Sequence, residues 1–309
     1  MTIPVIQVAA AVIFRSDNSF LLASRPPDKT HPGSWEFPGG KIEAGESAYE
    51  AMVRELREEV GITVTRAVPW ITRRHDYASA RVVLNFFRVY DWQGEPQPLE
   101  GQTLSWQTAA GVTVGPVLPA NIPVLRALTL PPLFGITQAG NDAAGFLSKL
   151  DRALERGLSL IQVREREIDD MEGFALSVVA RAHAAGARVI INSDTLLAQT
   201  VQADGIQLTS IQLAESRQRP DFGLVGASCH NASELDRAEQ LGCDYALLSP
   251  VLPTASHPGV IPLGWKRFAE LCAGRSIPVY ALGGLTVGNL ATAQQHGAHG
   301  IALLRGAWQ

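Results

Sequence analysis

Hydrophobic and polar positions alternate with a regular rhythm through the second half of the chain. Apolar runs of strand length are separated by helical patterns and span residues 133–137, 159–164, 188–192, 205–208, 224–228, 245–250, 278–282 and 300–304. Alternating strands and helices predict a parallel sheet, and eight such units close most readily into a (β/α)8 TIM barrel. Since the sequence ends at Gln309, we expect a truncated last helix, with part of the barrel wall uncovered or covered by the first domain or another subunit.

The first half has a different pattern. An apolar run at residues 5–14 is closed by four polar residues, and hydrophobic positions resume at 20–23, which predicts a hairpin entering a sheet. A short helical pattern at 122–128 is followed by Pro131 and Pro132, so a boundary is expected there. The predicted class is therefore α/β, with one domain at 1–130 and a second at 131–309.

A single helix carries the chemistry of the first half. Ser47 followed by Glu50 forms a capping box, and Gly61 suits a helix end, so the helix is predicted to run between Ser47 and Gly61. Every fourth residue is apolar, and the predicted buried stripe is Ala48, Met52, Leu56 and Val60.

Three carboxylates lie along one edge of this stripe. Glu55, Glu58 and Glu59 are spaced i, i+3 and i+4, so their charges repel one another unless a cation binds. Mg²⁺ is commonly held by a few carboxylates together with substrate phosphates, which indicates a polyphosphate substrate. Arg54 is expected to pair with Glu46 or a neighbouring carboxylate. The alternative is a solvated charged helix face.

Residues 40–62, GKIEAGESAYEAMVRELREEVGI, fit the 23-residue pattern G-x5-E-x7-R-E-U-x-E-E-x-G-U of the Nudix box, where U is aliphatic. With the preceding glycine turn at 35–41, residues 3–128 resemble the MutT-type Nudix hydrolases. That resemblance implies an α/β/α sandwich with a mixed sheet. It also implies Mg²⁺-dependent hydrolysis of 8-oxo-dGTP to the monophosphate and pyrophosphate, a nucleoside triphosphate substrate, and Mn²⁺ as the alternative ion.

The same resemblance assigns individual residues. The metal ligands would be the Gly39 carbonyl and four carboxylates, Glu55, Glu58, Glu59 and Glu100; the general base would be Glu55, Glu58 or Glu100. Arg25 would contact phosphate, Phe37 would lie in the substrate site and Asn121 would read the oxidised guanine. The arginine that helps to hold the base in the family falls on Ala80, with Arg81 adjacent, so Arg81 is the expected replacement.

Ligands of such barrels bind at the C-terminal ends of the strands. The motifs there, from Gln162 to Gly284, resemble the thiamine phosphate synthase and TenI superfamily over residues 133–308. The resemblance implies a bound thiazole or thiamine-related phosphate. The expected phosphate and ligand contacts are Arg164, Arg166, Asn192, Ser228, Thr254, Gly283, Gly284, Arg305 and Gly306. Glycine pairs let backbone amides approach an anion closely.

Departures from the synthase pattern concern its metal and pyrophosphate sites. The aspartates that would hold Mg²⁺ are replaced by Ser193 and Ser210 or nearby residues, and the pyrophosphate-binding lysines by Arg166 and His257. These losses argue against coupling chemistry. Ser228 and His230 match the S-x-H of TenI-type thiazole tautomerases, in which histidine shuttles a proton. A catalytic barrel, a noncatalytic ligand-binding barrel and a structural or oligomerising barrel all remain open.

The composition of the chain limits the classes of partner that it is expected to bind. The net charge of −4 and the pI of about 6.0 give no broad basic field, so no stable nucleic-acid complex is expected. The N-terminal apolar stretch is too short to span a bilayer, which predicts a cytoplasmic protein without a membrane partner. Cys229, Cys243 and Cys272 lack C-x-x-C spacing and are expected to be buried free thiols.

Two functional alternatives remain. The Nudix half could hydrolyse a thiamine-related or damaged cofactor diphosphate whose product the barrel binds. The barrel could instead be a noncatalytic sensor or scaffold for the first domain, and it could mediate homo-oligomer formation.

Overall fold

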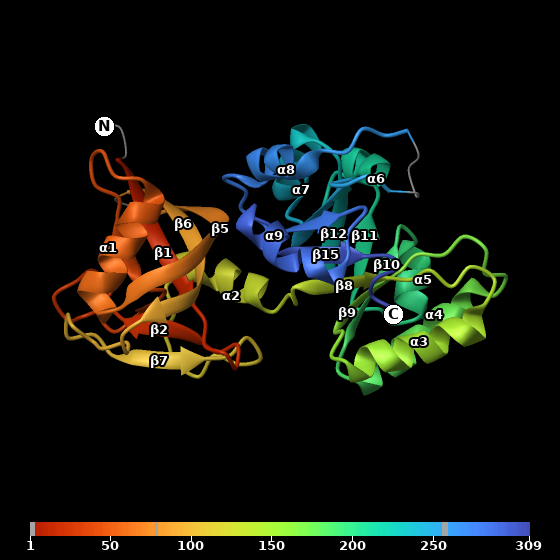
Figure 1. Ribbon diagram of the computed structural model, residues 1–309, viewed down its shortest axis with the longest axis horizontal. Helices are drawn as coiled ribbons and strands as arrows, with labels where there is room; N and C mark the ends of the chain where they lie inside the picture. The colour runs from red at the N-terminus through yellow and green to blue at the C-terminus, as the bar shows by residue number, and fades with distance from the viewer. Residues whose placement is uncertain (1–3, 78–79, 255–258) are drawn as a thin grey trace. The chain divides into compact units, whose positions relative to one another are not determined.

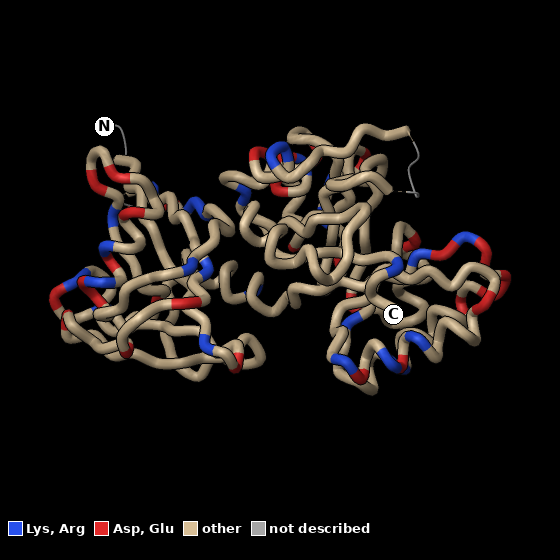
Figure 2. The backbone as a smooth tube through the Cα atoms, in the orientation of Figure 1, with Lys and Arg blue, Asp and Glu red and all other residues tan. Residues whose placement is uncertain are grey.

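The computed structural model describes residues 4–77, 80–254 and 259–309 (Figure 1). It divides into two compact units, one comprising Met1–Thr129 and Ala273–Ser276, the other Leu130–Cys272 and Ile277–Gln309. Lysine and arginine positions are interspersed with aspartate and glutamate in both units (Figure 2). Within the described part of the chain, no helix is both long and apolar enough to cross a membrane.

The described residues of the first unit form two sheets and two α-helices. In chain order its elements are β1 (Val5–Ile13), β2 (Phe20–Ser24), β3 (Trp35–Glu36), β4 (Gly39–Lys41), α1 (Ala48–Val60), β5 (Thr63–Asp76), β6 (Arg81–Gln93), β7 (Leu104–Gln107), the 3₁₀ turn η1 (Pro119–Asn121) and α2 (Ile122–Leu128). The predicted last helix of this half is thus confirmed as α2.

The larger sheet is mixed and has the order β4-β1-β6-β5. β1 pairs antiparallel with β4 and parallel with β6. The predicted hairpin is confirmed at its turn, where Phe14 and Phe20 form an antiparallel bridge and the Arg15 amide donates to the Ser19 carbonyl at 2.9 Å. The rest of β2 belongs to the second sheet, of order β3-β2-β7. Both edges of β1 are already occupied by β4 and β6, so β2 pairs with β7 instead.

The mixed sheet is buried on both faces. Successive side chains of a strand point to opposite faces, and β1 follows this rule: Ala9, Ala11 and Ile13 pack in the core that contains α1, while Ala10 and Val12 pack in the core that contains α2. The buried part of β1, covered on both faces, must be apolar throughout, which explains the uninterrupted hydrophobic run from Val8 to Ile13. The predicted α/β/α sandwich is confirmed.

Helix α1 begins and ends where the sequence predicts. Ser47 caps it with a complete capping box to Glu50, and Gly61 closes it in the left-handed conformation at φ 71°. The buried stripe differs at one position: Ala51 is fully buried, whereas Ala48 is only partly covered. Ala48 and Ala51 are three residues apart and lie on the same side of the helix. Since the buried stripe of a helix includes positions at both i+3 and i+4, Ala51 can take the buried place expected for Ala48.

The second unit is a closed barrel of eight parallel strands, β8 to β15, in chain order, with β15 pairing back to β8. Its elements are β8 (Leu133–Ile136), α3 (Ala143–Glu155), β9 (Leu160–Val163), α4 (Met171–Ala184), β10 (Arg188–Asn192), α5 (Thr195–Thr200), β11 (Gly205–Leu208), α6 (Ser210–Glu215), β12 (Leu224–Cys229), α7 (Ala232–Leu241), β13 (Tyr245–Leu248), α8 (Gly264–Cys272), β14 (Val279–Leu282), η2 (Val287–Asn289), α9 (Leu290–Gln295) and β15 (Gly300–Leu303). The predicted barrel is confirmed.

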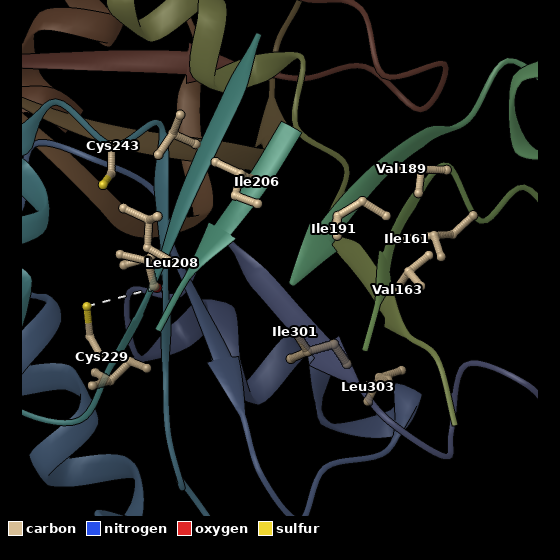
Figure 3. Close-up of a cluster of buried hydrophobic side chains, with 14 of the residues drawn as sticks. Ile161, Val163, Val189, Ile191, Ile206, Leu208, Cys229, Cys243, Ile301 and Leu303 are labelled. Carbon is tan, nitrogen blue, oxygen red and sulfur yellow. Dashed lines mark hydrogen bonds between the residues drawn. The ribbon is translucent and has the colours of Figure 1, made fainter. Parts of the chain in front are cut away.

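Each barrel strand alternates between the interior and the helical shell. Ile161 and Val163 of β9 pack among the helices, together with Val189 and Ile191 of β10 (Figure 3). Leu160 lies in the separate interior core. The three cysteines are buried thiols of the shell, as predicted.

Residues after β15 form bends and turns rather than a helix, as expected, and Trp308 in this segment covers part of the wall at β8. Trp308 is only 7% exposed, and its indole nitrogen donates to the Ile136 carbonyl at 2.8 Å. Its ring packs edge-on against Phe146 of α3, with centroids 4.8 Å apart. A side chain at Gly135 would collide with this ring, so glycine on β8 makes room for Trp308.

Candidate active site

The first unit contains a small acidic pocket lined by residues of β2, β3, β4 and α1. Its volume is about 20 Å³ and its lining is Ala23, Ser24, Pro26, Glu36, Phe37, Pro38, Gly39, Glu59, Glu100 and Gln102. Four residues singled out from the sequence therefore meet there: Phe37, Gly39, Glu59 and Glu100. Glu36 and Gln102 were missed as site residues. Their place in the sequence could have indicated them, because Glu36 directly precedes Phe37 and Gln102 lies two residues after Glu100.

Glu59 is a half-buried acid of this pocket. One of its carboxylate oxygens accepts a hydrogen bond from the Gly39 amide at 3.1 Å. Burial raises the pKa of the Glu59 carboxyl to about 8; the Gly39 amide opposes this rise, and the charges of Glu55 and Glu100 add to it. Gly39 cannot be another residue here, because its φ is 145° and an added Cβ would lie 2.1 Å from the Ala9 carbonyl oxygen.

Arg54 binds three carboxylates of the box. Its guanidinium donates to both oxygens of Glu46, at 2.9 and 3.0 Å, which confirms the predicted pair. It also donates to Glu55 at 2.9 Å and to Glu58 at 3.3 Å. The helix edge is therefore partly neutralised by one arginine, and Arg54 fixes where these acids lie.

The oxygen donors suit a hard divalent cation. Glu55 lies against Gly40, where an added Cβ would sit 2.2 Å from its carboxyl, and the Glu58 side chain is 57% exposed. Within residues 4–77, 80–254 and 259–309, no group of three or more His, Cys, Asp or Glu is already arranged to hold a metal. Glu59 nevertheless lies close enough to Glu55 and Glu100 for their charges to interact, and a cation would relieve that repulsion.

The cations beside the pocket are already paired. Arg25 donates to Glu36 at 2.6 Å, and Lys29 lies 3.5 Å from Glu100. Burial raises the pKa of Glu36, although the Arg25 charge opposes this shift. Phe37, 3% exposed, packs between the rings of Phe20 and Phe86.

The predicted base-reading residues differ in their surroundings. Asn121 is 2% exposed at the start of α2, and its side chain does not cap that helix. Arg81 lies at the start of β6 and donates to both oxygens of Asp76, at 2.7 and 3.3 Å. Ala80 is 9% exposed. Asn121 is thus placed in the interior, whereas Arg81 is engaged with an exposed carboxylate.

Polar side chains line the interior of the barrel near its C-terminal end. Gln162 donates to Asn192 at 2.8 Å, and Gln207 donates to Ser228 at 3.1 Å. The side-chain oxygens of both glutamines are buried and, within the described residues, accept no hydrogen bond. Sequence reasoning missed these glutamines as site residues, although a polar residue at an interior strand position is the expected signal of a ligand contact.

The predicted phosphate contacts fall on three loops. Arg164 and Arg166 follow β9; Arg164 is half-buried, and burial followed by the Arg166 charge lowers its pKa. Gly283 and Gly284 follow β14 with φ of 104° and 70°, and an added Cβ on either would collide with the 250–253 segment. Arg305 and Gly306 follow β15, and Thr254 follows β13.

The remaining barrel predictions concern the metal and the proton shuttle. Ser193 follows β10 in the left-handed region, at φ 60°. Ser210 begins α6. His230 is exposed after β12, and its backbone amide donates to Glu234 at 2.6 Å. His257 lies outside the described residues.

Two family models match the chain: the NUDIX domain over residues 5–127 and thiamine monophosphate synthase over residues 133–307. The 8-oxo-dGTP diphosphatase of Escherichia coli is 37% identical over 40% of this chain and 95% of its own length. The CTP pyrophosphohydrolase of the same organism is 40% identical over 40% of this chain and 90% of its own. The thiamine-phosphate synthase of Bacillus velezensis is 31% identical over 56% of this chain and 81% of its own.

The chain therefore belongs to both families: it is a Nudix hydrolase joined to a thiamine monophosphate synthase/TenI-type barrel. The predicted fusion is confirmed. Nudix hydrolases are enzymes that act on phosphoric anhydrides and generally use divalent metal ions.

Proposed function

We propose that residues 1–130 form a Mg²⁺-dependent diphosphatase domain that hydrolyses 8-oxo-dGTP to 8-oxo-dGMP and pyrophosphate. The observation that carries this proposal is the acidic pocket in which Gly39, Glu59 and Glu100 meet beside Phe37. The buried Asn121, whose amide does not cap its own helix, supports a base-reading role. The 8-oxo-dGTP diphosphatase of Escherichia coli, 37% identical, supports the substrate.

Residues of the pocket and of α1 would have separate roles in metal binding, proton transfer and phosphate binding. When bound, Mg²⁺ would neutralise phosphate oxygens and lower the pKa of an attacking water. Glu55, Glu58, Glu59, Glu100 and the Gly39 carbonyl would hold the ion, and Mn²⁺ would fit the same oxygens. Glu55, Glu58 or Glu100 would take the proton from water. Arg25 would exchange Glu36 for a phosphate oxygen, since guanidinium pairs with either anion.

A pyrimidine triphosphate is the second candidate substrate. Arg81 donates to Asp76 rather than into the unit's interior, so the arginine that would help to hold a guanine is not supplied at this position. The CTP pyrophosphohydrolase of Escherichia coli is 40% identical. A thiamine-related diphosphate is the third candidate, and it derives from the fusion with the barrel.

Initial-rate kinetics of the full chain separate these substrates. We expect kcat/KM for 8-oxo-dGTP to exceed the values for dGTP, CTP and thiamine diphosphate, with activity lost in EDTA and restored by Mg²⁺. A higher kcat/KM for CTP or for thiamine diphosphate would replace the guanine proposal with the corresponding alternative.

For residues 131–309 we propose a domain that binds a thiazole phosphate or a similar small phosphate without coupling chemistry. Backbone amides near Gly284 and Gly306 suffice for a phosphate. Ser193 and Ser210 offer no carboxylate for the Mg²⁺ that coupling needs. His230 would act as the proton shuttle if the barrel is a tautomerase, because imidazole titrates near neutral pH.

Three measurements on the full chain test the barrel. We expect calorimetric binding of a thiazole phosphate, no formation of thiamine phosphate from its two precursors, and loss of thiazole tautomerisation in His230→Ala with ligand affinity within a few fold. Thiamine phosphate formation would refute the absence of coupling. An unchanged tautomerisation rate in His230→Ala would remove the histidine from catalysis, and no binding would favour a scaffold.

A further inference from the structure

Glu165 lies in the chain between Arg164 and Arg166, the two predicted ligand arginines. Its carboxylate binds the loop after β8 to the loop after β9. Glu165 follows β9, and its two oxygens accept hydrogen bonds from consecutive backbone amides after β8: Ala139 at 2.9 Å and Gly140 at 3.3 Å. Charge-assisted bonds through both oxygens are stronger than neutral ones and fix the direction of the side chain.

A second contact between the same two segments involves Arg164, the residue before Glu165. The Arg164 amide donates to the Thr137 hydroxyl at 2.9 Å, and the Thr137 amide donates to the Gln162 carbonyl at 2.9 Å. Thr137 is fully buried. The segment after β8 is therefore held to the segment after β9 at three successive points, and the strands themselves pair in parallel. We call these contacts the β8–β9 clasp.

The β8–β9 clasp lies next to two like charges in the chain. Arg164 is half-buried, Arg166 is exposed, and they lie on either side of Glu165 in the chain. Their charges are close enough that Arg166, after burial, contributes to lowering the pKa of Arg164. Two neighbouring cations, one of them half-buried, repel one another, so a free loop would let them separate. An anion binds most tightly when that arrangement is fixed beforehand, since less ordering remains to be done.

We propose that Glu165 is a positioning residue: by holding the Ala139 and Gly140 amides, it keeps Arg164 and Arg166 together as a pre-organised site for a phosphoryl group. This inference rests on the proposed phosphate-binding role of the barrel. Positioning and simple charge repulsion predict opposite changes in phosphate affinity when Glu165 is removed. A carboxylate that only lies near an anion site repels the anion, so its removal would tighten binding.

The test uses the full chain in EDTA, with inorganic phosphate as the probe in titration calorimetry. Arg164→Ala must abolish the phosphate signal, which assigns it to the barrel. We expect Glu165→Ala to weaken phosphate binding at least about tenfold, the range for a lost hydrogen bond to a charged group. Glu165→Gln keeps one acceptor and should lose less. Asp169→Asn removes the same charge from an exposed position of the loop and should stay within about twofold.

Hydrogen exchange provides the second measurement, which separates positioning from misfolding. In Glu165→Ala, amide exchange should accelerate in the peptide covering 137–141 and remain unchanged in peptides from β12 to β14. Unchanged or tighter phosphate binding in Glu165→Ala would overturn the inference while leaving the phosphate site intact. A wild-type chain that binds no phosphate would overturn both the inference and the proposed role of the barrel.

Discussion

The Gly39 amide donates to the Glu59 carboxylate across 3.1 Å, although the two residues are twenty positions apart. This contact joins the first residue of β4 to the last turn of α1. It holds an acid of the pocket, whose carboxyl pKa is raised by burial, beside the Gly39 backbone, and oxygen ligands of this kind are those that a hard cation prefers.

We expect Glu58→Gln and Glu59→Gln each to lower kcat on the order of a hundredfold or more, because each removes a charge that stabilises the reacting phosphate through the metal. Thermal unfolding of Glu58→Gln should change little, since Glu58 is largely exposed and α1 keeps its caps. Glu95→Gln, an exposed acid outside the pocket, is the control and should retain full activity. Wild-type turnover with unchanged metal dependence in either variant would show that the metal lies elsewhere.

The pH dependence of stability should report Glu59. Its carboxyl has a pKa of about 8 in the folded, metal-free protein and an ordinary value when unfolded. Between these values the folded state binds more protons, so the free energy of unfolding falls as pH rises from about 4.5 to about 8. Calorimetric unfolding in EDTA should show this decrease, and Glu59→Gln should flatten it. A wild-type profile as flat as that of the variant would contradict the buried carboxyl.

Metal binding should be linked to the same proton. At pH 7 the Glu59 carboxyl is largely protonated, so binding of Mg²⁺ must release a proton. Titration calorimetry in two buffers with different ionisation enthalpies measures the number released. No release would mean that Glu59 does not become a charged ligand.

Asn121→Ala should reduce base selectivity more than turnover. A buried amide that bonds to a base edge contributes about 1 to 3 kcal/mol, so the ratio of kcat/KM for 8-oxo-dGTP over dGTP should fall roughly tenfold or more. Asn121→Asp, which keeps the shape but replaces the amide donor, is the matched variant and should also lose selectivity. A ratio that does not move in either variant would remove Asn121 from base reading.

Trp308→Ala should destabilise the barrel by about 3 to 5 kcal/mol, the usual cost of deleting a large aromatic side chain from a core. Trp308→Phe retains most of the packing against Phe146 but loses the bond to the Ile136 carbonyl, so we expect a loss of about 1 kcal/mol. Urea unfolding monitored by circular dichroism measures both. Equal stability of all three proteins would show that the segment after β15 does not support the wall.

The elements that the sequence determined are those set by neighbours along the chain. The capping box at Ser47, the glycine end at Gly61 and the spacing of the box are local, and they placed α1 and its acids correctly. The barrel was predictable because alternating strand and helix patterns leave few topologies open. Glu46 as the partner of Arg54 followed from the same short spacing.

Tertiary structure decided which of these residues meet. Strand pairing sent β2 to a different sheet from β1, and this could not be foreseen because the polar turn between them allows either outcome. Folding brought Glu36 and Gln102 into the acidic pocket and paired Arg25 with Glu36. It also brought Trp308 onto β8. Such contacts depend on surfaces formed by distant segments, and local propensity carries no information about which distant segment will cover a given face.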